Sequence, residues 1–395
     1  MKVKHGIMAA VAAFAATVAT AASITVDRVA QRWPWNNKLD ITYTVSGGQD
    51  VALGVYARIV FNANIDGVAY TIDGVHDIGA NASNGTHTVT WTLPSGVKAS
   101  GCTMTAQLLT ADNPSGDDYM VVDLADGTVS YEGLLANQAA SNARYTSDDT
   151  YKKSKLVLRK VPAGGPYRTG HANYSNASMP NSPIDRTTTS AYYIGIFPVT
   201  QYQYTKLCAA SVTDSTLPNT GINWNTLRAS AATAAQIPSV DAADTGSFFQ
   251  RLNYKTGLYF DLPTEVMFEI AMRAGRTTVF YWGDAWNGDK VNYNSSAWET
   301  VGSRDSNDWG LYNMNDNPPE ILRDNQSAAD LATLSDPFVP STVSSDSRAV
   351  RGGAYNSNGK EFRFHASYRD ASGKGASGSA SAMGAIGFRV ACVMK

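Results

Sequence analysis

Two carboxylates one helical turn apart are the first residues of this chain that could carry out acid–base chemistry. Glu265 and Glu269 both lie in the stretch DLPTEVMFEIAMRAG, residues 261–275. Two carboxyl groups can act as general acid and general base when their surroundings separate their pKa values. No titratable partner is evident beside them in the sequence, so we expect both to belong to the scaffold.

A second set of reactive side-chain types lies between residues 357 and 369. The candidates for catalysis are Ser357, Glu361, Arg363, His365 and Arg369. In EFRFHASYR, residues 361–369, apolar and polar residues alternate, which predicts a β-strand with one face in the core and the polar face toward solvent or a cleft. A metal-binding imidazole is one interpretation of His365, and a hydrogen-bonding histidine is the one that we favour.

Side-chain oxygens are dense in the segment from 282 to 324, where Asn and Asp recur without a regular period. Such oxygens suit calcium in an exported protein, and the alternative is a polar loop held by Asx-turns. The same region contains the tryptophans Trp282, Trp286, Trp298 and Trp309. They could stack on a sugar or a peptide, although we expect most of them to fill the core.

Local signals predict that the two carboxylates lie on a helix. The residue before Pro263 is pushed toward an extended conformation, Thr264 can cap the first turn, and Gly275 is suited to the helix end. The apolar residues between these limits fall on one face, which indicates a helix that packs on a core.

The surrounding residues predict an α+β domain with much irregular structure over residues 151–395. KLVLRKVPAG (155–164) is typical of a strand, a helix is expected to begin near Thr200, and another is expected within residues 240–252. In the last segment, the residues that alternate as in a strand are Phe388, Val390, Cys392 and Met394.

Ahead of this domain, apolar residues recur with period two, and turn residues separate the runs. KLDITYTV, HTVTWTLP and CTMTAQLL are three such runs, and VVDLADGTVSYE predicts a hairpin about Asp126 and Gly127. The pattern predicts an all-β, immunoglobulin-like sandwich over residues 23–133, with a spacer or docking role. The Ala-, Asn- and Ser-rich segment 134–150 is predicted to be a linker.

The N-terminus and the composition indicate an exported globular protein. Lys2 and Lys4 precede a short apolar run that ends in small residues, which predicts a signal peptide over residues 1–22 and no membrane span after its removal. The expected location is the periplasm, the cell surface or the extracellular space. The 395 residues are 43% hydrophobic and 17% charged, with a formal net charge of −2 and no basic stripe, so we expect no nucleic-acid binding.

Three cysteines, Cys102, Cys208 and Cys392, remain after the predicted cleavage and lie far apart in the sequence. Their odd number and wide spacing indicate that stability does not rest on a disulfide framework. A bridge between Cys208 and Cys392 stays open, and buried free thiols are the interpretation that we favour.

Six sequence blocks, in order, resemble those of the sulfatase-modifying-factor domain, whose best-known member is the formylglycine-generating enzyme. The blocks are YYIGIFPVTQYQY, RLNYKTGLYFDLPTEVMFEIAMRAG, YWGD, GLYNMNDNPPEI, VRGGAY, and FRFHASYR with GAIGFRVAC. The resemblance covers roughly residues 155–393 and implies a C-type-lectin-like fold. It places Glu265 and Glu269 at scaffold positions of the family's signature helix, and it does not include the preceding sandwich.

The resemblance also implies a chemistry for which this chain lacks the residues. The enzyme resembled uses two cysteines to bind copper and activate oxygen, and soft thiolates are the ligands that Cu(I) prefers. The expected counterparts are Ser357 and Glu361, and no cysteine lies between Cys208 and Cys392. A second branch of the family binds iron through histidines, mostly from an additional helical domain, whereas the histidines after the predicted cleavage site are His76, His87, His171 and His365. We therefore expect neither copper nor iron.

The family's structural calcium indicates which oxygens could hold a metal here. Asn317 and Glu320 match the family's GN-x-W-E block, and Asn292 comes from the oxygen-rich segment. The match is incomplete, because Asp316 stands in place of the glycine and two prolines precede the glutamate. Calcium and a metal-free polar loop both stay open.

These observations favour an exported, non-catalytic module that binds a glycan or a protein. One alternative is an enzyme of the family with non-cysteine chemistry, such as a formylglycine-generating-type oxidoreductase. Another is a retroelement-diversified ligand-binding protein, because residues 355–387 are rich in Asn, Ser, Tyr, Gly and Ala. The third is a rigid cell-surface spacer.

Overall fold

The computed structural model describes residues 23–32, 37–48, 57–73, 82–98, 101–110, 117–171, 183–229, 246–325, 348–357, 359–369 and 385–394. The predicted signal peptide lies outside these ranges, as do residues 358 and 370–384 of the block considered for diversification. Within the described ranges, no helix has the length and hydropathy needed to cross a bilayer.

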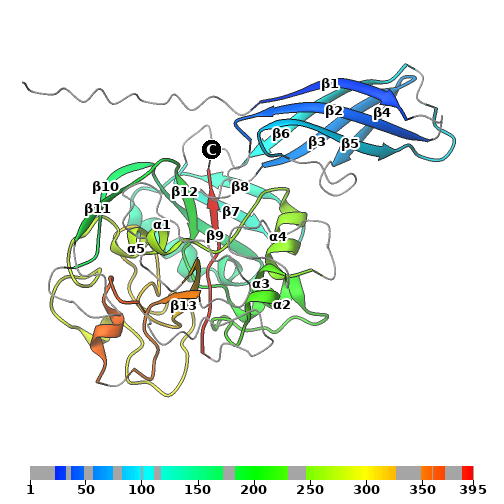
Figure 1. Cartoon of the computed structure of the whole chain (residues 1–395). Helices are drawn as coiled ribbons and strands as arrows, with labels where there is room; N and C mark the ends of the chain where they lie inside the picture. The colour runs from blue at the N-terminus through cyan, green and yellow to red at the C-terminus, as the bar shows by residue number, and fades with distance from the viewer. Residues whose placement is uncertain are drawn as a thin grey trace, which may run out of the picture.

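Two three-stranded antiparallel sheets, ordered β1-β2-β5 and β4-β3-β6, form the N-terminal module (Figure 1). The strands are β1 (Ser23–Gln31), β2 (Lys38–Ser46), β3 (Ala57–Ile65), β4 (Val68–Asp73), β5 (Gly85–Thr92) and β6 (Thr103–Thr110). Alternation places Ile41 and Tyr43 of β2 in one core with Ile59 and Phe61 of β3. The period-two prediction is confirmed for these strands, and the immunoglobulin-like assignment stays a prediction.

A five-stranded sheet, ordered β15-β12-β9-β7-β8, organises the larger domain, and each neighbouring pair is antiparallel. Its strands are β7 (Tyr119–Asp123), β8 (Val129–Glu132), β9 (Lys155–Val161), β12 (Tyr192–Gly195) and β15 (Ala391–Val393). β15, close to the C-terminus, pairs with β12 and forms one edge of the sheet, so two segments that lie about 200 residues apart in the sequence are hydrogen-bonded neighbours.

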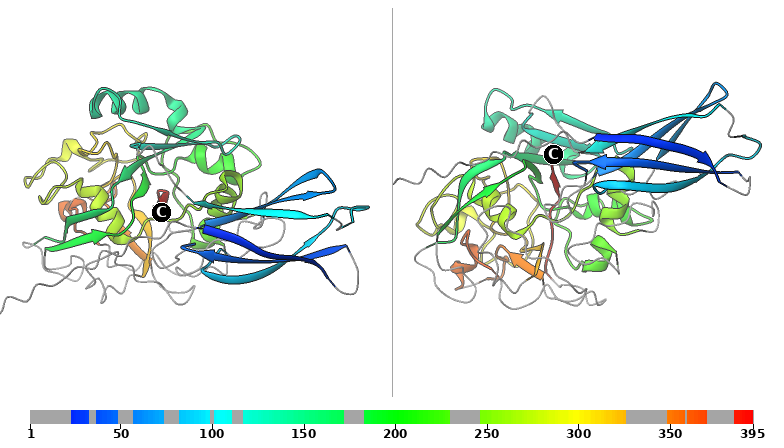
Figure 2. Two further views of the ribbon diagram at one scale, coloured as in Figure 1. Left: turned by 90° about the horizontal axis from the view of Figure 1, so that it is seen from above. Right: turned by 45° about the horizontal axis from the view of Figure 1, so that its top comes forward.

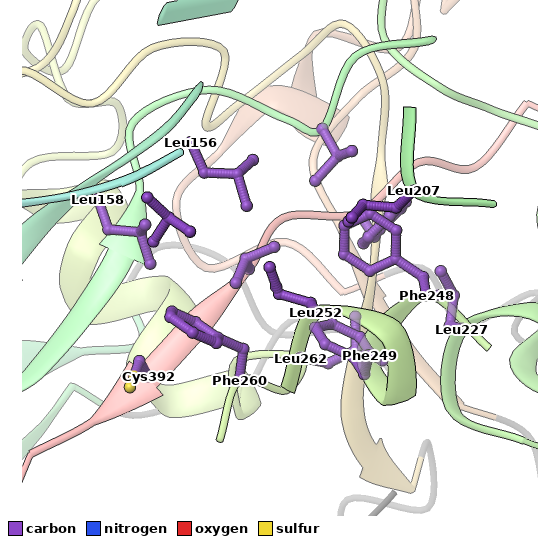
Figure 3. Close-up of a cluster of buried hydrophobic side chains, with 14 of the residues drawn as sticks. Leu156, Leu158, Leu207, Leu227, Phe248, Phe249, Leu252, Phe260, Leu262 and Cys392 are labelled. Atoms are coloured by element: carbon purple, nitrogen blue, oxygen red, sulfur yellow. The ribbon is translucent and has the colours of Figure 1, made fainter. Parts of the chain in front are cut away.

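Helices cover both faces of this sheet (Figures 1 and 2). On one face lie α2 (Gln201–Cys208), α3 (Trp224–Arg228) and α4 (Phe248–Thr256), and on the other α1 (Gln138–Ser147) and α5 (Glu265–Arg273). Figure 3 shows the first core, in which Leu156 and Leu158 of β9 belong to the same apolar cluster as Phe248 and Phe249 of α4. Alternate residues of each strand therefore serve two separate cores.

The remaining elements are short, and long irregular segments connect them. They are η1 (Asp149–Lys152), β10 (Gly164–Thr169), β11 (Ile184–Thr188), η2 (Gly288–Lys290), β13 (Glu320–Asn325), β14 (Arg348–Arg351) and η4 (Glu361–Phe364). The predicted cap at Thr264 is confirmed, because its side chain accepts the N–H of Met267 at 3.3 Å. The helix expected near Thr200 is also confirmed, and there Thr200 accepts the N–H of Gln203 at 3.2 Å.

The structure corrects the assignment of residues 117–150. The hairpin about Asp126 and Gly127 forms as predicted, but β7 pairs with β9 and so belongs to the larger domain rather than to the sandwich. The predicted linker 134–150 contains α1, whose Tyr145 is 2% exposed and packs in the second core. The error arose because the short amphipathic signal of α1 is weak, and pairing between distant strands leaves no local signature.

The structure also corrects the strand predicted at residues 361–369. Residues 361–364 form the 3-10 helix η4, and no strand follows in residues 365–369. From residue 364 to residue 369 both supposed faces are buried, since His365 is 5% exposed and Ser367 is 1% exposed, whereas Phe362, which was predicted to face the core, is 38% exposed. The alternation was misleading here because a short 3-10 helix followed by a buried loop can show the same spacing as a strand.

The dependence of β9 on β7 predicts where the chain can be divided. A fragment of residues 117–395 should unfold cooperatively, whereas one of residues 151–395 should not, because it exposes Leu158 and the edge of β9. Circular dichroism during urea unfolding distinguishes the two fragments. Equal midpoints for the two fragments would contradict this account of the domain.

Candidate functional site

Glu265, in the first turn of α5, is completely buried and is held by two arginines from later in the chain. Arg351 of β14 donates from Nε to Oε1 at 3.0 Å, and Arg369 donates from Nη2 to Oε2 at 2.7 Å. These arginines lie 86 and 104 residues further along the chain. A buried carboxylate costs several kcal/mol unless it is paired and hydrogen-bonded, and the two guanidinium groups meet that requirement.

Glu269, one turn later, shares Arg351 with Glu265, at 2.9 Å between Oε2 and Nη2. Its Oε1 accepts the N–H of Gly170 at 2.8 Å and Nε of Arg273 at 2.9 Å. Burial acts to raise the pKa of Glu269, but the charges of Arg351 and Arg273 outweigh it and lower the pKa below its usual value. Both carboxylates are therefore fully engaged, which supports their role in the scaffold.

Five aromatic residues, Phe280, Trp282, Trp286, Tyr293 and Phe364, form what we call the aromatic cluster. Trp282 lies flat on Phe280, with ring centroids 4.6 Å apart and an angle of 6° between the planes. Trp286 contacts Tyr293 at 5.0 Å and Phe364 at 5.4 Å between centroids. Phe280 and Phe364 are buried, whereas the other three are half-buried and present part of their rings to solvent.

Polar groups from η4 and the residue after it border the aromatic cluster. Tyr293 donates its hydroxyl to Glu361 at 2.6 Å, and this hydrogen bond lowers the pKa of Glu361 and raises that of Tyr293. His365 stands edge-on to Phe280 at 4.9 Å between centroids. Burial, together with the nearby His171, lowers the pKa of His365 to about 4, so its imidazole is neutral at pH 7.

The five residues proposed for catalysis therefore separate into different roles. Glu361 and His365 contact the aromatic cluster, and Arg363 lies between them in η4, with a buried Nε that has no hydrogen-bond partner among the described residues. Ser357 is 1% exposed, and its Oγ accepts the N–H of Ala354 at 3.2 Å inside a turn. Arg369 belongs to the ion-pair network of Glu265.

The predicted calcium ligands come together only in part. Asn292 donates from Nδ2 to Oδ1 of Asn317 at 3.3 Å, but both oxygens of Glu320 accept from Arg389, at 2.7 and 2.6 Å. A carboxylate that accepts hydrogen bonds from a guanidinium group at both oxygens does not fit a metal-ligand role, so the structure does not support Glu320 as a calcium ligand. Asp316 accepts the backbone N–H of Asn292 at 2.5 Å, and Oδ1 of Asn292 is buried without a partner in the described residues.

None of the three cysteines belongs to the aromatic cluster or to the group of predicted calcium ligands. Cys392 of β15 is buried in the first core, where Figure 3 labels it near Phe260, and Cys208 ends α2 and packs against the same core. Both are free thiols, as is Cys102, which settles the alternative of a Cys208–Cys392 bridge. Across the ranges that the structure describes, no three His, Cys, Asp or Glu side chains are grouped as a metal site. The residues present therefore do not fit Cu(I), which needs soft ligands.

Sequence reasoning missed part of this site. Tyr293 and Phe280 were not singled out, although they contact Glu361 and His365, and His171 was not connected with His365. Most of the tryptophans were expected to fill the core. Trp309 does pack against the second core, whereas Trp282 and Trp286 are half-buried in the aromatic cluster. The signals that did point to this region were the YWGD block, the tryptophans Trp282 and Trp286, and the candidates Glu361 and His365.

The sequence of the larger domain matches the model of a known family. The family model for the sulfatase-modifying factor enzyme 1-like domain matches residues 150–394, and the chain belongs to this family. The match begins at η1, after β7, β8 and α1 have already entered the domain's sheet and second core. No curated protein sequence matches the chain significantly.

Three solved structures are similar to the chain. Treponema denticola variable protein 1 is 21% identical, with a TM-score of 0.44 over 60% of this chain and 95% of that one. PvdO from Pseudomonas aeruginosa is 17% identical, with a TM-score of 0.46 over 60% and 94%. CarF is 17% identical, with a TM-score of 0.34 over 60% and 99%.

The ion-pair network predicts a large cost for removing one carboxylate. Glu265→Gln removes the carboxylate charge that faces Arg369 and leaves Arg351 with Glu269 alone, so the free energy of unfolding should fall by about 3–5 kcal/mol. Glu299→Gln is the matched control, because Glu299 pairs with Arg304 at a half-exposed position and should change stability by less than about 1 kcal/mol. Denaturant unfolding measures both, and equal effects would contradict the network's role.

The buried imidazole predicts an acid-sensitive stability. The pKa of His365 is lowered from 6.5 in the unfolded chain to about 4 in the folded protein. Below pH 6.5 the unfolded chain therefore binds a proton that the folded protein does not, so the free energy of unfolding is highest above pH 6.5 and decreases as the pH falls toward 4. The loss should be on the order of 2–3 kcal/mol at pH 4. His365→Asn should flatten this part of the curve of unfolding free energy against pH. An unchanged slope in the variant would rule out His365 as the source.

Proposed function

We propose that the larger domain is a non-catalytic module of the sulfatase-modifying-factor family that binds a glycan or a protein through the aromatic cluster. The observation that carries this proposal is the pairing of half-buried aromatic rings with fixed polar groups on a rigid frame. Trp282 and Trp286 expose ring surface, while Glu361 is held in place by Tyr293. Aromatic planes beside oriented polar groups recognise sugars and peptides by stacking and hydrogen bonding.

The chemistry at the positions of the family's cysteines supports a binding role over catalysis. Ser357 and Glu361 are the expected counterparts, and neither has the environment of an activated group. The Ser357 hydroxyl is buried in a turn, and the hydrogen bond from Tyr293 keeps the pKa of Glu361 low, so that Glu361 is a poor proton donor at pH 7. Export and a location in the periplasm, at the cell surface or outside remain part of the proposal.

The alternatives are distinguished by what each requires. An oxidoreductase of the family would convert the cysteine of a sulfatase peptide into an aldehyde, and that product would overturn our preference. A retroelement-diversified binding protein requires a near-copy of the codons for residues 355–387 beside a reverse-transcriptase gene. A rigid spacer, for which the immunoglobulin-like N-terminal module would be an extension, predicts no binding on any array.

Calcium stays a proposal as a structural ion, with a changed set of ligands. The carboxylate of Asp316 and the unpartnered Oδ1 of Asn292 are buried oxygens of the kind that calcium prefers, whereas Glu320 is excluded by Arg389. These residues would hold the ion at the base of the loops that carry the aromatic cluster. Metal analysis of the purified protein tests this proposal.

Removal of one exposed ring tests the binding proposal. A ligand identified on a glycan or peptide array should bind Trp286→Ala at least about tenfold more weakly than wild type, because aromatic anchors dominate such interfaces. Tyr254→Ala is the control, since Tyr254 is an exposed aromatic residue on α4. Titration calorimetry measures both affinities, with thermal unfolding to verify the fold. An undiminished affinity in Trp286→Ala, or no binding by the wild type, would contradict the proposal.

A further inference from the structure

A cavity of about 560 Å³ opens among α2, α3 and α4, away from the aromatic cluster. Figures 1 and 2 show these helices on the opposite side of the domain from η4. The volume is within the usual range for small-molecule sites. No residue that lines the cavity belongs to the candidate site described above, so any ligand here would bind independently of it.

Arg251 of α4 gives the cavity a positive charge, and none of the described residues neutralises it. Its Nε donates to the carbonyl of Gly246 at 2.7 Å, and its Nη1 donates to that of Leu207 at 3.0 Å. Those two bonds fix the guanidinium group, and Nη2 has no acceptor among the residues that the structure describes. In the part of the chain that the structure describes, Arg251 makes no ion pair, and no acidic residue lines the cavity.

Gln250, which is 8% exposed, places a second donor at the same cavity. Its Oε1 accepts the N–H of Ser247 at 2.8 Å as part of the capping box of α4. This bond fixes the amide, so the Nε2 group is oriented as a donor and has no acceptor among the described residues. An amide donor that borders a cavity can donate to water or to the acceptor group of a ligand.

The remaining walls combine an aromatic ring with hydroxyl and amide groups. Tyr204 of α2 lines the cavity, and its ring is parallel to that of Phe248 at 5.8 Å between centroids. The side chains of Asn223 and Thr226 from α3 lie on another side. A carboxylate would meet the Arg251 and Gln250 donors, while hydroxyl groups would meet the amides and a sugar ring would pack near Tyr204.

We propose that this cavity is a second ligand site, separate from the aromatic cluster, and that it binds a small acidic sugar with its carboxylate on Arg251 and Gln250. The charge sets the class of ligand, because a neutral sugar would leave the guanidinium group uncompensated. The proposal goes beyond the function of the aromatic cluster, and Trp286→Ala should leave binding at this cavity unchanged.

Calorimetry with matched sugars tests the class of ligand. The probes are galacturonic acid, glucuronic acid and N-acetylneuraminic acid, with galactose, glucose and N-acetylmannosamine as their neutral counterparts. At least one acid should bind wild type at least tenfold more tightly than its counterpart, and the preference should shrink with added salt. If no acid binds more tightly than its neutral counterpart, the proposal is overturned.

Gln250→Glu tests the site itself. Glutamate is a standard partner in a capping box, so the cap of α4 is preserved while the donor at Nε2 becomes an acceptor that repels the ligand carboxylate. Affinity for the acidic probe should fall at least tenfold. Gln201→Glu, which adds the same charge on α2 outside the cavity, should leave affinity unchanged. Equal affinities in wild type and Gln250→Glu would overturn the proposal.

Alkylation of Cys208 provides a readout in the wild-type protein, without reliance on any variant. Cys208 lines the cavity, and burial raises the pKa of its thiol to about 11, so labelling is measured at alkaline pH by mass spectrometry of the Cys208 peptide. A saturating acidic probe should slow this labelling at least tenfold and leave labelling of Cys102 unchanged. Labelling of Cys208 at an unchanged rate would overturn the proposal.

Discussion

Burying charge inside a protein is costly unless every charged group meets its partner, and this constraint organises the larger domain. Glu265 and Glu269 enter the interior on α5, and Arg351 from β14 contacts both, while Arg369 completes the shell around Glu265. The helix, the strand and the segment after η4 must therefore adopt one arrangement together. A loop-rich domain that offers few regular backbone hydrogen bonds gains its specificity from such pairs.

Similar buried pairs recur wherever irregular chain meets the sheet. Asp261, just before α5, accepts from Arg228 of α3 through two bonds of 2.7 Å, and Glu320 of β13 holds Arg389 next to β15. Each pair joins segments that are distant in sequence. The loops between them are thus fixed at their ends, which allows the aromatic cluster to present rings and polar groups in defined positions without a strand or helix beneath them.

The two proposed ligand sites depend on this frame in different ways. The aromatic cluster is carried by irregular chain and by the short helix η4, and it takes its geometry from ring packing and from the Tyr293–Glu361 hydrogen bond. The cavity among α2, α3 and α4 is built on helices, where capping and backbone carbonyls fix Gln250 and Arg251. The two proposals therefore assign recognition to two separate surfaces of one scaffold, and a scaffold of this kind can carry more than one site.

The sequence by itself determined the local elements, the family and the missing chemistry. Thr264 and Thr200 predicted where α5 and α2 begin, and the alternation of apolar residues predicted the strands of the N-terminal module. The lack of cysteine between residues 208 and 392 can be read directly from the sequence. These features follow from neighbours within a few residues, where capping and alternation act.

Only the tertiary structure decided which distant residues meet. It moved β7, β8 and α1 from the predicted sandwich and linker into the larger domain, and it turned the predicted strand at 361–369 into η4 and a buried loop. It also showed that Glu320 forms an ion pair with Arg389 and that Tyr293 donates a hydrogen bond to Glu361. Such partners are selected by burial and charge compensation across the whole chain, and no spacing along the sequence records that selection.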